Sequence, residues 1–73
     1  MNKLIGVFSE DDSIFVKREL YKISQLGYAT EQLDVSSLKV KMPTPCFIFC
    51  KHDKAYKKVV GKVSSDSLVQ YLL

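Results

Sequence analysis

Residues 42–54 read MPTPCFIFCKHDK. Within them, Cys46–Cys50 is a continuous apolar run of strand length that begins directly after Pro45. A run with apolar residues on both faces predicts a central strand of a sheet. The polar residues Lys51–Lys54 predict a hairpin turn, and Ala55–Val63 predicts the strand that returns beside the first.

Upstream of this run, the sequence predicts a strand followed by a helix. Leu4–Phe8 is a short apolar strand. Ser9 and Asp12 have the spacing of a capping box, with Asp in place of the usual Glu, and mark the start of the helix. Gly27 stands where a left-handed C-cap would end it. The apolar stripe of the helix consists of Val16, Leu20 and Ile23.

The remaining segments complete an alternating pattern of strands and helices. Tyr28–Val35 alternates between polar and less polar residues and predicts a half-buried strand. Residues 36–45 form a connection with two prolines. Ser65 is placed to cap a last helix. The apolar residues expected to bury one side of that helix are Leu68, Val69, Leu72 and Leu73.

The predicted order is therefore β-α-β-β-β-α, an α/β arrangement in one domain, residues 1–73. A parallel strand–helix–strand unit with a following antiparallel hairpin gives a mixed four-stranded sheet. With only two helices, both can cover one face of that sheet, which leaves the other face without a helix.

Composition limits the class of protein. The chain has 73 residues, 47% of them hydrophobic, and a formal net charge of +3. The hydrophobic content excludes a disordered chain, and no apolar run approaches the ~20 residues of a membrane span. The apolar N-terminal residues are too few for a signal peptide and are followed directly by acidic residues. Two cysteines without an export signal indicate free thiols in a reducing cytoplasm.

The second half of the chain resembles the C-terminal half of thioredoxins. In that family a Thr-Pro pair with a cis peptide bond opens a hydrophobic strand, a Lys-Asn-Gly-Lys-like turn follows, and a Val-Gly pair precedes the last helix. Thr44-Pro45, Lys51–Lys54 and Val60-Gly61 stand in the same order here. The first half, with Phe8-Ser9 and a short loop before the helix, resembles glutaredoxins. The resemblance implies a minimal thioredoxin-like fold in which Pro45 is cis.

Two departures from the family pattern bear on function. Glutaredoxins carry a Cys-x-x-Cys pair where this chain has Ser13 and Val16. A thiolate at a helix N-terminus is the nucleophile of disulfide exchange, and neither replacement can take that role. The second departure is length, because only about ten residues separate Val35 from Cys46, where relatives usually fit a helix. A further strand and helix at the start of thioredoxins are also missing, which implies an uncovered sheet face.

The two remaining cysteines do not form a replacement pair. Cys46 and Cys50 lie four residues apart on one strand, which separates them by about 13 Å. A disulfide needs Cα atoms within roughly 7 Å, and a shared zinc ion needs ligands ~2–2.3 Å away, even with His52 nearby. We expect no metal and no cofactor. The acidic cluster Glu10–Asp12 could bind a metal, but helix capping and the helix dipole explain it more simply.

Lysines gather on the predicted hairpin. Lys58 and Lys62 are expected to share one strand face with Tyr56 and Val60. One interpretation is that these lysines protect an edge strand and keep it soluble. The other is a basic face that meets an acidic protein or, with an aromatic for stacking, a nucleic acid.

The sequence thus favours a redox-inactive thioredoxin-like domain that binds another protein. Such a domain would serve as a small accessory or regulatory protein, of the kind that a virus encodes. The chain could also pair with a second copy through the uncovered face. The expected binding residues are Phe15, Thr44, Pro45, Tyr56, Lys58 and Lys62. Two alternatives stay open: a thiol-disulfide oxidoreductase or redox sensor that uses Cys46 alone, and a nucleic-acid-binding protein.

Overall fold

The computed structural model describes residues 2–72. Six main elements follow one another in the predicted order, with three short 3-10 turns between and after them. They are strand β1 (Asn2–Phe8), turn η1 (Glu10–Asp12), helix α1 (Ser13–Gln25), strand β2 (Ala29–Asp34), turn η2 (Val35–Ser37), strand β3 (Cys46–Lys51), strand β4 (Lys54–Val60), helix α2 (Ser65–Leu68) and turn η3 (Val69–Tyr71). No helix within residues 2–72 has the length and apolar character needed to cross a membrane.

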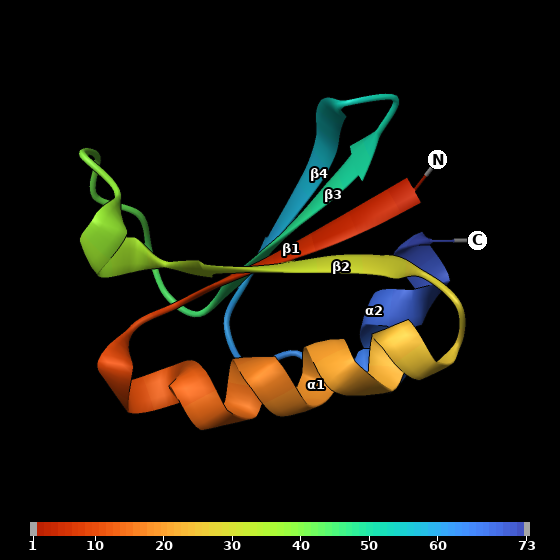
Figure 1. Ribbon diagram of the computed structural model, residues 1–73, viewed down its shortest axis with the longest axis horizontal. Helices are drawn as coiled ribbons and strands as arrows, with labels where there is room; N and C mark the ends of the chain where they lie inside the picture. Colours follow the sequence, from red (N-terminus) through yellow and green to blue (C-terminus); the bar gives the residue numbers. More distant parts are fainter. Residues whose placement is uncertain (1, 73) are drawn as a thin grey trace.

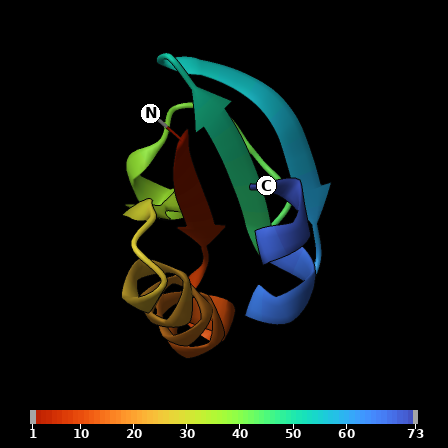
Figure 2. The same ribbon diagram turned by 90° about the vertical axis from the view of Figure 1, so that its right-hand side faces the viewer.

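The four strands form one mixed sheet in the order β2-β1-β3-β4. β1 runs parallel to β2 and antiparallel to β3, and β3 pairs antiparallel with β4. Both helices lie on the same side of the sheet (Figures 1 and 2). The structure confirms the predicted four-stranded sheet with two helices on one face.

The core lies between the sheet and α1. The predicted apolar stripe of the helix is buried and packs against β1, β3 and the C-terminal turns. Gly6 of β1 faces this stripe at very close range, since a Cβ atom there would lie 2.7 Å from Val16 Cγ1 and from Leu20 Cδ1. The absence of a side chain at Gly6 therefore lets α1 approach the sheet closely.

The ends of the helices differ in detail from the sequence prediction. Ser9 and Asp12 form the predicted capping box, but the residues after Ser9 make a 3-10 turn and α1 begins only at Ser13. Gly27 adopts φ 96° and donates its N–H to the Ser24 carbonyl at 3.0 Å, as a left-handed C-cap requires. The last helix is shorter than predicted, because a 3-10 turn follows α2. The predicted burial of Leu73 lies outside the described residues.

The β3–β4 hairpin carries the predicted turn and one unpredicted irregularity. His52 and Asp53 both have positive φ, 54° and 64°, which identifies a two-residue type I′ turn. Further along, the pairing shifts so that Tyr56 is the extra residue of a β-bulge. Its hydroxyl donates to the Tyr71 carbonyl at 2.8 Å, on the helix side of the sheet. The prediction that Tyr56 shares a face with Val60 is therefore wrong, because the bulge re-aims its side chain.

Candidate functional site

The N-terminal end of α1 is the position at which the resemblance placed a reactive dithiol. Ser13 is half-buried, and its hydroxyl donates a long hydrogen bond to the Glu10 carbonyl at 3.4 Å. Val16 is fully buried in the core. No histidine or lysine is hydrogen-bonded to the Ser13 hydroxyl within residues 2–72, so this serine lacks the base that would activate it as a nucleophile.

Phe15 sits beside this end of α1 and carries two cations over its ring. The guanidinium of Arg18 and the Nζ of Lys62 each lie 5.9 Å from the ring centroid, within the range of cation–π contact. Lys62 thus turns toward α1, and the expectation that it shares a strand face with Lys58 is wrong. It follows β4, which ends at Val60, so the alternation of that strand does not extend to it.

The segment before β3 also lies at this corner of the molecule. The Thr44-Pro45 peptide bond is cis, as the sequence resemblance implied. Pro45 is buried and its carbonyl accepts the Gly61 N–H at 2.8 Å. The Pro45 carbonyl is therefore not free to pair with an added peptide strand. Thr44 is half-exposed, and neither its N–H nor its C=O has a backbone partner within residues 2–72.

The two cysteines are free and differ in environment. Cys46 is fully buried and Cys50 half-buried. Burial raises the pKa of the Cys46 thiol above its usual value; the Lys58 charge opposes that rise and the Asp12 charge adds to it. Among residues 2–72, no three His, Cys, Asp or Glu side chains are grouped so that they could bind a metal ion.

The sheet face without helices is largely aliphatic. The strand register aligns its side chains in rows across the sheet. One row is Leu33–Val7–Cys46–Val60, and the next is Glu31–Ile5–Ile48–Lys58. Val60 is 51% exposed, and Leu33, Ile5 and Ile48 are half-buried. We call Ile5, Leu33, Ile48 and Val60 the open face.

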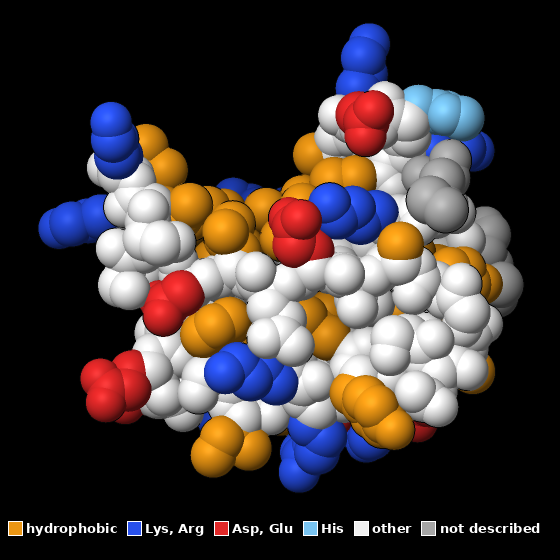
Figure 3. All heavy atoms as spheres, viewed as in Figure 1, with side chains coloured by type: hydrophobic (Ala, Val, Ile, Leu, Met, Phe, Trp, Pro, Cys, Tyr) orange, Lys and Arg blue, Asp and Glu red, His pale blue; other side chains and the backbone are white. Residues whose placement is uncertain are grey.

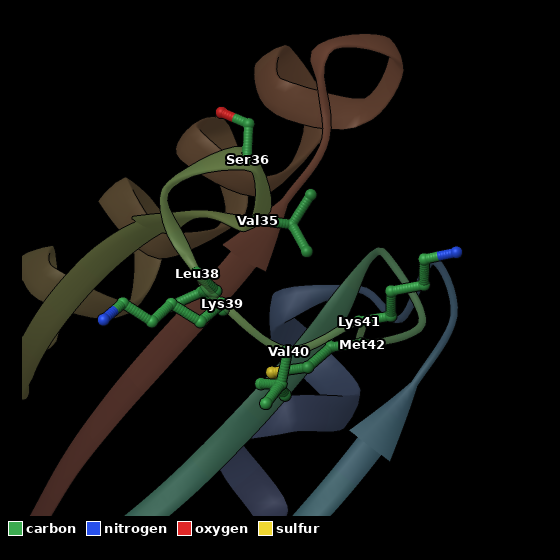
Figure 4. A pocket seen from close by; sticks show the side chains of 7 residues that line it. All are labelled: Val35, Ser36, Leu38, Lys39, Val40, Lys41 and Met42. Carbon is green, nitrogen blue, oxygen red and sulfur yellow. The ribbon is translucent and has the colours of Figure 1, made fainter.

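The open face is the floor of a hollow between two raised walls. Figure 1 shows the connection between β2 and β3 rising on one side and the β3–β4 hairpin on the other, both away from the helices. Apolar side chains line the hollow between them, and lysines project from both walls (Figure 3). An open cavity of about 490 Å³ adjoins the connection (Figure 4); it is lined by Val35, Ser36, Leu38, Lys39, Val40, Lys41 and Met42.

The hollow carries an excess of positive charge. Lys3 pairs with Glu31 at 2.9 Å on the sheet itself. The wall lysines are exposed and make no ion pair within residues 2–72. They are Lys39 and Lys41 on the connection and Lys58 at the margin of the floor. We call these three the rim lysines. Lys51 and Lys54 lie in the same row as Asn2, whose side chain donates to the Leu72 carbonyl, and so belong to the helix side of the sheet.

One buried polar residue was missed at the sequence level. Glu19 is only 3% exposed, and its carboxylate accepts the Ser65 N–H at 2.9 Å, which ties α1 to the start of α2. Lys22 and Arg18 approach the same carboxylate at 3.4 Å and 3.3 Å. Glu19 follows Val16 by three residues, which places it on the buried stripe of α1. This spacing is the feature of the sequence that could have predicted its burial.

Comparisons with known proteins identify the fold. No protein-family model matches the chain, and no curated protein matches its sequence. Among solved structures, the chain is similar to a chain in the crystal structure of the complex of ferredoxin:thioredoxin reductase and thioredoxin f2. The TM-score is 0.68, over 97% of this chain and 74% of that chain, at 17% sequence identity. The fold is thioredoxin-like.

Within this thioredoxin-like fold, the site residues divide between two surfaces. Phe15, Thr44 and Pro45 belong to elements that meet at the corner near the start of α1, and Lys62 joins them through its contact with Phe15. Lys58 borders the open face. Tyr56 belongs to neither, because it contacts the C-terminal turn.

Proposed function

We propose that this chain is a redox-inactive, shortened member of the thioredoxin and glutaredoxin group that works by binding another protein. One observation carries the proposal: the position of the family's dithiol holds a hydroxyl and a fully buried valine at Ser13 and Val16. The capping box before α1 and the thioredoxin-like fold support the proposal that the chain keeps the scaffold of the group but lacks its reactive thiols.

The thiol of Cys46 is poorly suited to replace that dithiol. Thiol–disulfide exchange requires an accessible thiolate. Cys46 is fully buried and burial raises its pKa, so at neutral pH the thiol form predominates and the sulfur is shielded. Free cysteines of this kind suit a reducing compartment such as the cytoplasm.

Two surfaces support protein binding. At the corner, the backbone of Thr44 is without a backbone partner within residues 2–72, as an edge that accepts an extended peptide would be. Phe15 lies at the same corner with two cations over its ring. The open face supplies a second, aliphatic surface.

Reduction of insulin disulfides by dithiothreitol, followed by turbidity, tests the redox part of the proposal. We expect the wild-type chain to leave the uncatalysed rate unchanged. Cys46→Ser and Cys50→Ser variants are the matched controls and should behave identically. A wild-type rate above background that is lost in Cys46→Ser would instead establish the lone-thiol enzyme.

A further inference from the structure

We infer that the open face binds an amphipathic helix of a partner protein, with the apolar side of the helix on the floor and acidic side chains against the rim lysines. This inference rests on the proposed protein-binding function and names its ligand class. It follows from the chemistry of the floor, the charge of the walls and the shape of the hollow (Figure 3).

The floor selects a helix rather than an extended peptide. Ile5 lies on β1 and Ile48 on β3, the two central strands, whose backbone groups pair with strands on both sides. A segment lying on this face finds apolar side chains but no free backbone donors or acceptors. It must therefore satisfy its own backbone hydrogen bonds, as a helix does.

The positive charge of the rim lysines favours an acidic partner. The three rim lysines have no carboxylate partner within residues 2–72, whereas Lys3 on the floor is already paired with Glu31. Acidic side chains flanking the apolar stripe of a helix would complement them. A second copy of this chain fits less well, because a two-fold interface would bring the rim lysines of one copy toward those of the other.

The floor also argues against nucleic acid. Single-strand binders stack bases on aromatic rings. Tyr56 is turned to the helix side, and the rows of the open face contain only aliphatic, cysteine and charged side chains. A nucleic acid held by electrostatic attraction alone would make no contact with the aliphatic floor. An amphipathic helix would contact both the floor and the rim lysines.

A designed peptide tests the inference. A helix that spans the 29 Å long axis of the molecule needs about 19 residues. The probe is therefore an amphipathic peptide of roughly that length, with leucine and alanine on one side and glutamate on the other, titrated into isotope-labelled protein and followed by NMR. We expect shifts confined to the open face, to Lys58 at its margin and to residues 35–42 of the connection. The same peptide with every glutamate replaced by lysine should bind at least ~10-fold more weakly.

Variants locate the binding. Ile48→Lys should weaken the glutamate peptide at least ~10-fold, because it places charge on the apolar floor. The double charge reversal Lys41→Glu/Lys58→Glu, at exposed positions that leave the core intact, should also weaken it. Leu26→Lys is the matched control, since Leu26 is 61% exposed at the end of α1, and it should bind as wild type does.

Each other outcome overturns the inference. Equal affinity for both peptides, shifts outside the open face, its rim lysines and residues 35–42, or a homodimer that Ile48→Lys dissociates in sedimentation would each contradict it. Binding of a single-stranded oligonucleotide to the open face in place of the peptide would do so too. The insulin assay on the same preparation separates the two proposals: catalysis refutes the redox-inactive function, while an inactive chain that ignores the glutamate peptide refutes only the helix-binding inference.

Discussion

The double variant Ser13→Cys/Val16→Cys is expected to reduce insulin disulfides at least ~10-fold faster than background, where the wild-type chain has no effect. The first cysteine would stand at the first residue of α1, where the helix dipole favours a thiolate. The second would stand one turn later and resolve the mixed disulfide. Turbidity measured with dithiothreitol as the reductant gives the rate.

Single variants and charge variants make this prediction specific. Ser13→Cys alone should form mixed disulfides without turning over insulin, because it lacks a resolving thiol. The acidic residues Glu10 and Asp11 precede the new thiolate and oppose its negative charge. Neutralising them as Glu10→Gln/Asp11→Asn should therefore raise the rate of the double-cysteine variant. A folded double variant without activity would refute the claim that the scaffold retains the family's site geometry.

Loss of the buried carboxylate Glu19 is expected to cause the largest drop in stability from a single polar substitution. Glu19→Ala leaves the buried Ser65 N–H without its acceptor, which costs about 1–3 kcal/mol. A 73-residue domain has a total free energy of unfolding of roughly 4–11 kcal/mol. Urea denaturation followed by circular dichroism measures the difference. Glu31→Ala, which removes a carboxylate paired on the surface, should change stability far less.

The same residue gives the stability a pH dependence. Burial by itself would raise the pKa of Glu19, but the Ser65 N–H and the charges of Lys22 and Arg18 outweigh it and hold the pKa below 4.5, its ordinary value. The stability that the ionised carboxylate contributes is present above pH 4.5 and is lost as the pH falls through the lower folded-state pKa. Glu19→Gln keeps an acceptor for Ser65 and should flatten this acid-side decline. An unchanged pH profile in Glu19→Gln would contradict the assignment.

The element order could be predicted because local and tertiary signals agree in this chain. The apolar run Cys46–Cys50 forms a central strand, and the helical stripe at Val16, Leu20 and Ile23 packs against the sheet as its spacing indicated. The polar tetrad Lys51–Lys54 forms the predicted tight turn. In the strand and in the helix, the residues that the pattern marks as apolar are also those that the sheet or the core wholly or partly buries.

The side-chain directions on β4 could not be predicted in the same way. Alternation along a strand assumes an unbroken register, and the bulge at Tyr56 breaks it. Lys62 lies past the end of β4, so contact with Phe15 rather than strand geometry sets its direction. The partner of Glu19 was also hidden, since Ser65 is 46 residues away in sequence. The hollow depends on how the connection from β2 to β3 rises, which no local pattern specifies.

Turnover of a glutathione-mixed disulfide by the wild-type chain tests the central claim most directly, because that reaction needs only one reactive thiol. The substrate is a peptide carrying one glutathione, with reduced glutathione and glutathione reductase to report each turnover. We expect that the wild-type chain and the Cys46→Ser/Cys50→Ser variant both match the rate without protein. A wild-type rate above that background, lost when Cys46 is replaced, would show that the chain is a thiol enzyme and contradict the account.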